Sequence, residues 1–585
     1  MKTSKFVELR PKREYLNPKF ENYVLSTRKC EVRRLQIESP KKFSLSKTQY
    51  GLQHALVTAN VDRLIRDSFT TSRDQLYYFA EQGTLIKMEY SSRIGTVKYS
   101  EPVASITYTE SENSYPPSLV FPDLDYAVIS NGSGQLFIYK TQQRAENLEW
   151  SLVYEMKTEE NEESTAYVVV DARSMEQNKL SVLLQTVNKY CSSSHFYSSL
   201  LWLDLDLDVS NVVRRREVKY TGVLKMATLN YNATELITVG SGKAKLTSDT
   251  EKQNLSQVED VEMAEPEKPA YVWTQNAEEI TITFALGEHI DKKDVNYKLN
   301  SAGITVKVKD RTLLEGALEG AVHADSSVWT IGGESLELTV FKARGHFWRT
   351  LVPTDSRGVY EPDPYEVSKA LESLEKFTTD SQALSSSEAE QSTFNVEQME
   401  ECDATEDQPT FIHWLQGDSH ELTQTVDISN QQILFQTRLQ PGGPKNLCTR
   451  YEHDGIVWSV DELDLGDGER IGHKFTLNAF GYIQASHSNK ISSNCAQDGN
   501  FAFVVHGDHH LFVYLQNVPV GGDTVLKNRK TGKTCQTYAE QLVISTSSVM
   551  KPTDGKNILG VAHSNSSLYV MTDDAIIACQ IRTED

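Results

Sequence analysis

A pattern of two short apolar runs joined by a tight polar turn recurs along this chain and limits its fold more than any other feature. It occurs in residues 127–139 (AVISNGSGQLFIY), 502–514 (AFVVHGDHHLFVY) and 559–571 (LGVAHSNSSLYVM), with a shorter turn in 76–88, and it begins again in 236–245. Apolar runs on either side of a turn rich in Gly, Asn, Asp or Ser are typical of β-hairpins. Hairpins repeated in this way predict the blades of a β-propeller.

Two polar, acidic stretches interrupt this texture at residues 248–269 and 379–409. Neither holds enough large apolar side chains to form a core, so both are predicted to be solvated linkers. They separate a middle segment, 270–355, from the flanking segments 1–247 and 410–585. Because the hairpin repeats lie in both flanking segments, the β-propeller-like domain is expected to be discontinuous.

The middle segment has its own strand pattern. In 280–284, 304–308 and 336–340, apolar residues alternate with polar or charged ones. A period of two with one apolar face indicates half-buried antiparallel strands, and several such strands in about 85 residues predict a small β-sandwich. The predicted fold is therefore all-β, a discontinuous β-propeller-like domain with an inserted antiparallel β-sandwich.

Two points of the architecture stay open. The flanking segments are also compatible with two unrelated β-sandwiches, and the absence of a WD signature leaves the number of blades undetermined. One helix is predicted in 356–378, because Asp363 can cap it, Pro364 occupies its first turn, and apolar residues follow at helical spacing up to Phe377.

Composition narrows the class of protein. The 585 residues include 59 Lys and Arg against 81 Asp and Glu, a net charge of −22, so direct nucleic-acid binding is not expected. The 7 cysteines form no CxxC pair, and no apolar run is long enough to insert into a membrane. A reducing compartment, cytoplasmic or nuclear, is expected.

The sequence contains no convincing catalytic motif, and the protein is predicted not to be an enzyme. Gly532–Thr534 resembles the end of a phosphate-binding loop, but Lys527 stands where that loop requires a glycine. His506, His509 and His510 fall in a predicted hairpin turn without further ligands, so no metal and no cofactor is expected. The basic run 214–216 predicts local salt bridges or a partner contact.

The middle segment also carries a set of residues in a characteristic order. These are Tyr271–Gln275 (YVWTQ), Ile280–Phe284, 314–318 (LEGAL), 326–331 (SSVWTI), and 336–342 leading to Trp348. In this order they resemble a CS domain of the NudC family. Residues 16–23 (LNPKFENY), 477–486 (LNAFGYIQAS) and 525–530 (VLKNRK) are similar to segments of NudC-family proteins outside that domain, so the resemblance spans nearly the whole chain.

The resemblance implies a co-chaperone or adaptor that binds and stabilises client proteins, often β-propeller proteins, together with the heat-shock chaperone machinery. It also implies coatomer subunits, a DEAH-box RNA helicase and dynein-pathway proteins as partners, in cytoplasm and nucleus. The candidate partner-binding residues are Tyr271, Trp273, Gln275, Trp329 and Trp348. Core packing is the alternative role for the tryptophans, because a small sandwich needs large apolar side chains.

Two functional hypotheses follow. In the first, the CS domain binds the clients or the chaperone machinery. In the second, the propeller is a protein-interaction scaffold that selects the partner, and the CS domain is structural or regulatory.

Overall fold

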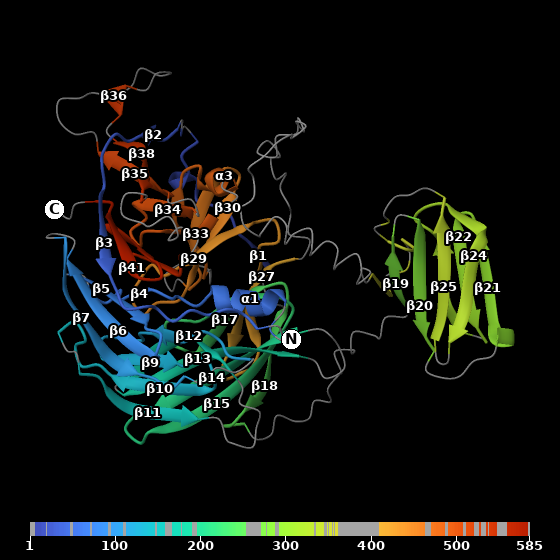
Figure 1. The fold of residues 1–585 in the computed structure, drawn as a ribbon, viewed down its shortest axis with the longest axis horizontal. Coiled ribbons are helices and arrows are strands. Elements are labelled where there is room, and N and C mark those ends of the chain that lie inside the picture. The colour runs from blue at the N-terminus through green and yellow to red at the C-terminus, as the bar shows by residue number, and fades with distance from the viewer. Residues whose placement is uncertain are drawn as a thin grey trace, which may run out of the picture. The chain divides into compact units, whose positions relative to one another are not determined.

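In the computed structural model, the chain forms two compact units, Met1–Gln253 with Asn395–Asp585, and Asn254–Phe394 (Figure 1). The structure describes residues 6–252, 271–360 and 409–582 except for short gaps at 19, 21, 47–48, 50, 71–72, 92–94, 109–112, 147–148, 158–165, 177, 190–195, 277, 287–291, 310, 333–334, 344–347, 349, 354, 356, 462–469, 486–489, 507–509, 520–525, 528–533, 536 and 547–557. Of the predicted helix 356–378, the structure describes residues 357–360, where the prediction is wrong because strand β26 (Gly358–Tyr360) pairs with another strand of its sheet. Residues 361–378 and most of the two predicted linkers lie outside the described residues.

The described part of the first unit contains seven sheets of four or five strands. In chain order, these are blade 1, β4 (Ile65–Arg66), β5 (Asp74–Phe79), β6 (Thr84–Ser91) and β7 (Thr96–Ser105); blade 2, β8 (Ser118–Val120), β9 (Tyr126–Ser130), β10 (Gln135–Lys140) and β11 (Ser151–Lys157); blade 3, β12 (Val168–Glu176), β13 (Lys179–Lys189), β14 (Phe196–Asp206), β15 (Asn211–Thr221) and β18 (Lys243–Asp249); and blade 4, β16 (Leu224–Leu229), β17 (Glu235–Gly240), β27 (Phe411–Gln416), β28 (Leu422–Asp427) and β1 (Phe6–Glu8).

The remaining blades are blade 5, β29 (Ile433–Thr437), β30 (Asn446–Tyr451), β31 (Asp454–Ser459) and β32 (Gly472–Leu477); blade 6, β33 (Lys490–Cys495), β34 (Phe501–His506), β35 (His510–Pro519), β38 (Thr537–Ser545) and β2 (Val24–Leu25); and blade 7, β39 (Gly560–His563), β40 (Ser567–Met571), β41 (Ala575–Gln580) and β3 (Glu31–Gln36). A short ribbon of β36 (Leu526–Lys527) and β37 (Thr534–Cys535) lies between β35 and β38 in the sequence. The helices among the described residues of this unit are η1 (Arg13–Tyr15), α1 (Leu52–Ala59) and α3 (Phe480–Ala485).

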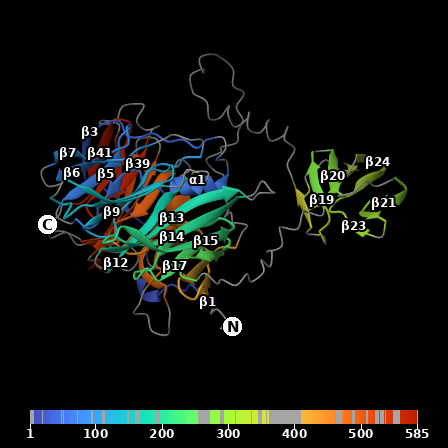
Figure 2. The same cartoon turned by 90° about the horizontal axis from the view of Figure 1, so that it is seen from below.

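The seven sheets close into a ring. Seven clusters of buried apolar side chains each join two neighbouring blades, and one of them joins blade 7 to blade 1 through Tyr569 and Tyr78. A ring of face-packed sheets is a β-propeller, and Figure 2 shows the same unit from below. The predicted propeller is thus confirmed, with seven blades.

The propeller is discontinuous in two ways. In blade 4, β17 pairs with β27, although residues 241–410 separate them in the sequence. In blade 7, β3 from the N-terminal region pairs with β41 at the other end of the chain, with Val32 opposite Cys579. Each flanking segment therefore supplies strands to the other's sheets, which excludes two independent β-sandwiches.

Four of the five repeats identified in the sequence are paired hairpins: β5–β6, β9–β10, β34–β35 and β39–β40. The prediction for 236–245 is wrong. There β17 and β18 do not pair, because the chain turns at Ser241 and Gly242 and β18 joins the edge of blade 3 beside β15. Gly242 permits this turn, since a Cβ at that position would lie 1.2 Å from the carbonyl oxygen of Thr221.

The N-terminal region contacts the outside of blades 4 to 7. Strand β1 runs parallel to β28, and β2 runs parallel to β38. Between them, the backbone N–H of Lys12 donates to Nδ1 of His473 at 3.0 Å, and the Tyr23 hydroxyl donates to the carbonyl oxygen of Asn478 at 2.6 Å. The contact at His473 requires a neutral imidazole, because Nδ1 acts as the acceptor.

Protonation of His473 is expected to weaken this contact. Burial lowers the pKa of His473 to about 4, so the folded state takes up its proton at lower pH than the unfolded chain does. The stabilisation is complete above the unfolded pKa of about 6.5 and is lost progressively until the pH falls through the folded pKa of about 4. Between pH 7 and pH 5, the free energy of unfolding should therefore decrease by about 2 kcal/mol. In urea unfolding at both pH values, His473→Gln should lose less of its free energy of unfolding between pH 7 and pH 5 than the wild type does. His323→Gln, at an exposed strand position, should behave like the wild type.

The second unit is an antiparallel β-sandwich. One sheet has the order β24 (Val322–Gly332), β25 (Ser335–Lys342), β20 (Glu279–Ala285), β19 (Tyr271–Gln275), β26 (Gly358–Tyr360), and within it β26 runs parallel to β19. The other sheet has the order β21 (Val295–Asn300), β22 (Gly303–Val308), β23 (Arg311–Ala317). The short helix η2 (Lys292–Asp294) precedes β21. The alternating residues expected to form its core, including Ile282, Val306 and Leu338, are fully buried.

The described residues also include several cysteines and a few short helices. Of the described residues, Cys30, Cys448, Cys495 and Cys579 are free thiols. No helix in the described part of the chain is long and apolar enough to cross a membrane.

Candidate protein-interaction sites

Three of the five candidate partner-binding residues lie on β19. Tyr271, Trp273 and Gln275 alternate along this strand and therefore share one face. That face is turned into the sandwich, where Tyr271 and Trp273 belong to the core cluster, and the exposed fractions of the three residues are only 1%, 4% and 6%. Trp348 is buried as well, with 3% exposed. The structure gives these four residues a packing role, and their role in partner binding stays a prediction.

Gln275 holds together two parts of the sandwich. Its amide nitrogen donates to the carbonyl oxygen of Trp348 at 2.7 Å, and its amide oxygen accepts from the Trp348 backbone N–H at 2.9 Å. The same oxygen accepts from Nζ of the buried Lys342 at 2.7 Å. Burial lowers the pKa of Lys342, yet its ammonium also donates to the carbonyl oxygen of Asn276 at 2.8 Å. The network satisfies polar groups that would be costly to bury alone.

Trp329 is the one candidate that reaches the surface. It lies on β24, an edge strand of its sheet, and is only partly buried against the core. Val328, the preceding residue, points to the other face of the strand and is 58% exposed. Between His323 and Val328 the pairing with β25 shifts register, which bends the strand locally.

Trp329 is one of several apolar residues of this unit that are only partly buried. The edge strands β21 and β24 of the two sheets contact each other at one side of the sandwich. The partly buried apolar residues packed against the core are Leu286, Val295, Tyr297, Leu299, Trp329 and Ile331, most of them on these two strands. We call this set, with Val328, the β21–β24 edge. Sequence reasoning identified only its Trp329, because edge position depends on sheet order.

The β21–β24 edge has the properties of a protein-binding site. In the described part of the unit, β24 pairs on one side only, so its other side can accept an added strand. Apolar side chains that are half-buried before binding lose little conformational freedom on complex formation, and aromatic residues are common interface anchors.

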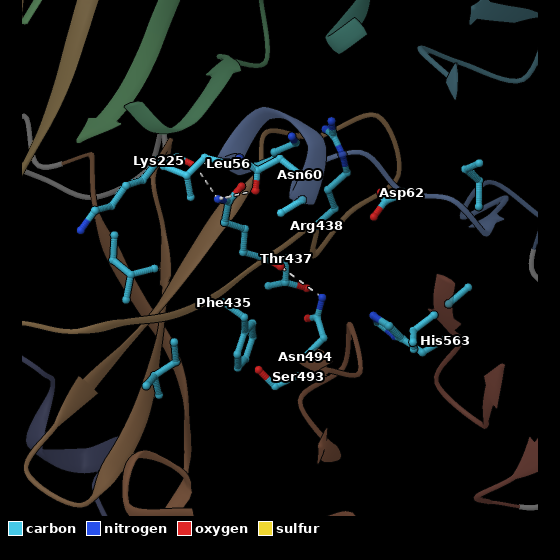
Figure 3. A pocket seen from close by; sticks show the side chains of 18 of the residues that line it. Leu56, Asn60, Asp62, Lys225, Phe435, Thr437, Arg438, Ser493, Asn494 and His563 are labelled. Carbon is cyan, nitrogen blue, oxygen red and sulfur yellow. Dashed lines mark hydrogen bonds between the residues drawn. The ribbon is translucent and has the colours of Figure 1, made fainter. Parts of the chain in front are cut away.

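The propeller offers a second site at its centre. Helix α1 is held by side-chain bonds to the loops between blades: Gln53 Nε2 donates to the Gly222 carbonyl oxygen at 3.0 Å, and His54 Nδ1 lies 2.8 Å from the Tyr115 hydroxyl. Beside α1 is a cavity of about 780 Å³ (Figure 3). It is bordered by α1 and by the first strands of blades 1, 4, 5, 6 and 7, the strands nearest the propeller axis.

Amide side chains fix the wall of this cavity. Asn60 Nδ2 and Gln436 Nε2 both donate to the carbonyl oxygen of Lys225, at 3.0 and 2.8 Å, and Asn494 Nδ2 donates to the carbonyl oxygen of Gln436 at 3.1 Å (Figure 3). His563 lies on the wall opposite Asn60, and burial lowers its pKa to about 4, so it is neutral at physiological pH. The cavity is therefore preformed and polar on several sides.

The basic run 214–216 forms local salt bridges, as one of its two interpretations predicted. Arg214 pairs with Asp249 at 2.7 Å and with Asp418 at 2.6 Å, which links the edges of blades 3 and 4. Arg215 and Arg216 pair with acidic residues of their own blade. Among the described residues there is no group of three or more His, Cys, Asp or Glu side chains that could hold a metal ion.

Comparisons with known proteins agree with this architecture. The CS domain family matches residues 269–342. NudC domain-containing protein 1 of Mus musculus is 27% identical over 598 residues, covering 99% of this chain and 99% of the relative, and that of Xenopus laevis is 26% identical with 98% of each covered. None of these names describes a catalytic activity.

Solved structures resemble each part of the chain. A nuclear movement protein from E. cuniculi is 26% identical and covers 14% of this chain and 98% of that chain, with a TM-score of 0.13. The C-terminal WD40 domain of Sif2 is 8% identical and covers 89% of this chain and 99% of that chain, with a TM-score of 0.31. The propeller assignment rests on the closed ring of seven sheets.

Proposed function

Because the chain is similar from end to end to proteins named NudC domain-containing protein 1 and carries a CS domain, we propose that it is a non-enzymatic adaptor whose CS domain binds other proteins. The observation that carries this proposal is the β21–β24 edge, an unpaired strand beside half-buried apolar side chains. The resemblance supports client proteins, often propellers, and the heat-shock chaperone machinery as partners, in cytoplasm and nucleus.

A second candidate function rests on the other unit. The seven-bladed ring presents a preformed central cavity and a broad set of loops, and propellers commonly serve as interaction scaffolds. In this case the propeller selects the partner, with coatomer subunits or an RNA helicase as candidates, and the CS domain has a structural or regulatory role.

Removing the CS domain distinguishes the two functions. The experiment compares the full chain with a variant in which a flexible linker replaces residues 270–355. A thermal melt first confirms that the propeller of the variant is folded, and the partners of both proteins are then identified by affinity purification and mass spectrometry. Loss of clients and chaperones together supports the CS domain as the binding surface. An unchanged set of partners contradicts it and supports the propeller scaffold.

A point variant tests the β21–β24 edge itself. Val328→Glu places a charge on an exposed position and should leave the sandwich folded, but it should weaken client binding about fivefold or more, since an interface anchor contributes roughly 1 kcal/mol or more. Leu152→Glu is the matched control, because Leu152 is an exposed aliphatic residue on the edge strand β11 of the propeller. Equal recovery of clients with both variants would place their binding site elsewhere.

A further inference from the structure

The central cavity has a charge opposite to that of the chain. The whole protein carries a net charge of −22, yet the charged residues that line the cavity are four cations and one carboxylate. The cations are Arg66, Lys225, Arg438 and Lys445, and the carboxylate is Asp62. A concave site lined mainly by one sign of charge concentrates the electrostatic potential and attracts the opposite charge.

Two of these cations are compensated within the protein. Arg66 Nε lies 2.6 Å from Oδ1 of Asp74. Arg438 Nη2 lies 2.8 Å from Oδ1 of Asp171, but Nη1 of Arg173 also lies 2.7 Å from the same oxygen. One carboxylate therefore serves two guanidinium groups at this end of the cavity.

Lys445 adds a third cation to this end. Its backbone N–H donates to Thr228 Oγ1 at 3.0 Å, which fixes the start of its side chain beside the arginines. In the described part of the chain, no carboxylate lies within salt-bridge distance of its ammonium. Desolvation, and then repulsion from Arg438, lowers the pKa of Lys445 to about 8, so it is still largely protonated at pH 7.

Asp62 does not remove this excess. It borders the cavity near Arg438 (Figure 3), and desolvation raises its pKa. Even with both carboxylates ionised, Arg173, Arg438 and Lys445 outnumber Asp62 and Asp171. Burying an excess cation is unfavourable unless an anion or water approaches it.

We propose that this cavity binds a compact anionic ligand with two or more phosphate or carboxylate groups, held by Lys445 and Arg438. The volume of about 780 Å³ lies within the range of small-molecule sites, and the fixed amides of Asn60 and Asn494 provide polar surface for the rest of the ligand. Planar guanidinium groups and ammonium groups are the usual partners of such anions. The site is independent of the proposed role of the CS domain.

Isothermal titration of the full chain tests the proposal, with pyrophosphate as the phosphate probe and citrate as the carboxylate probe, at pH 7 and low ionic strength. One-to-one binding of at least one probe is expected, and the tighter of the two identifies the chemical group. Lys445→Gln should weaken binding at least tenfold, whereas Lys445→Arg should largely retain it. Lys243→Gln, an exposed lysine outside the cavity, should have no effect.

The pH dependence separates loss of charge from structural damage. Binding to the wild type should weaken as the pH rises from 7 to 9, because Lys445 loses its proton, and binding to Lys445→Arg should not weaken in this range. Thermal melts would confirm that all variants are folded. No binding of either probe, or equal binding by the wild type and Lys445→Gln, would overturn the proposal.

Discussion

Asp171→Asn is expected to lower the free energy of unfolding of the propeller by about 3–5 kcal/mol, because removal of one partner leaves buried charges without compensation. Asp171 lies on β12 in blade 3 and is fully buried. Its carboxylate accepts bonds from Arg173 of the same strand and from Arg438, which follows the first strand of blade 5. It also accepts from the Thr228 hydroxyl and the Leu229 N–H of blade 4.

The substitution keeps the size of the side chain but removes its charge. Asparagine would present an amide N–H₂ group toward one of two buried guanidinium groups, and neither arginine would retain an ionised partner there. Because these groups belong to blades 3, 4 and 5, the loss should affect the closed ring rather than a single blade. An effect of this size is a large fraction of the 5–15 kcal/mol typical of a folded protein.

The dependence on pH should have a defined direction. Burial alone raises the pKa of Asp171, but attraction to Arg173 and Arg438 and its hydrogen bonds outweigh burial and hold the pKa well below the usual range. The stabilisation is therefore complete above the unfolded pKa near 4 and is lost only as the pH falls further. Urea unfolding followed by tryptophan fluorescence at pH 5 and pH 3 should show that Asp171→Asn has a smaller acid dependence than the wild type, because the loss begins below the unfolded pKa.

Asp206→Asn provides the control for this prediction. Asp206 ends β14 in the same blade, and its carboxylate accepts a bond from the Asp208 N–H in an exposed turn. Its substitution should change the free energy of unfolding by less than about 1 kcal/mol. Equal effects of the two substitutions would show that the buried charge cluster does not stabilise the ring.

Trp348→Ala is expected to destabilise the second unit by about 3–5 kcal/mol, the usual cost of removing a large buried aromatic side chain. Trp348 is 3% exposed, and its ring packs so closely on Gly320 that a Cβ at that position would lie 2.9 Å from it. Its backbone is held by Gln275, and the ammonium of Lys342 lies 5.9 Å from the centre of its ring. Loss of the ring would open a cavity beside a buried ammonium.

Hydrogen exchange of the full chain measures this effect unit by unit. Amide protons of β19, β20 and β25 should exchange faster in Trp348→Ala, whereas those of the propeller should not change. Val328→Ala, at a position 58% exposed, should leave exchange in both units close to that of the wild type. If exchange in the sandwich were unchanged in Trp348→Ala, Trp348 would not be part of the stabilising core. The variant should also reproduce the client loss expected on removal of the CS domain.

The interaction surface shows a limit of reasoning from sequence. Alternation predicted the strands of the sandwich and the face that each buries, because burial of one face imposes a period of two. The same alternation places Tyr271, Trp273 and Gln275 on one face without showing whether that face is inside or outside. Their burial follows from the packing of that face against the other sheet, which depends on contacts across the whole unit.

The number of blades shows a related limit. In blade 5, Trp458 Nε1 donates to Thr449 Oγ1 nine residues earlier, whereas in blade 3 the equivalent bond joins Trp202 Nε1 to Ser181 Oγ across 21 residues. Strands and turns of such different lengths leave no fixed sequence period. The insertion in blade 4 and the distant origin of β3 in blade 7 obscure the repeat further.

The sequence by itself determined the local structure. Apolar runs around tight turns predicted the hairpins, and alternation of apolar and polar residues predicted a separate sandwich. The order of characteristic residues in the middle segment carried the family resemblance. These follow from interactions between residues close in the chain. Only the tertiary structure decided which strands are neighbours, which residues are exposed, and where charges meet. Asp62, Asp171 and the loop that carries Arg438 and Lys445 are three separate segments of the chain, and they meet only because seven blades close around a common axis. Such contacts depend on long-range packing, which no local pattern records.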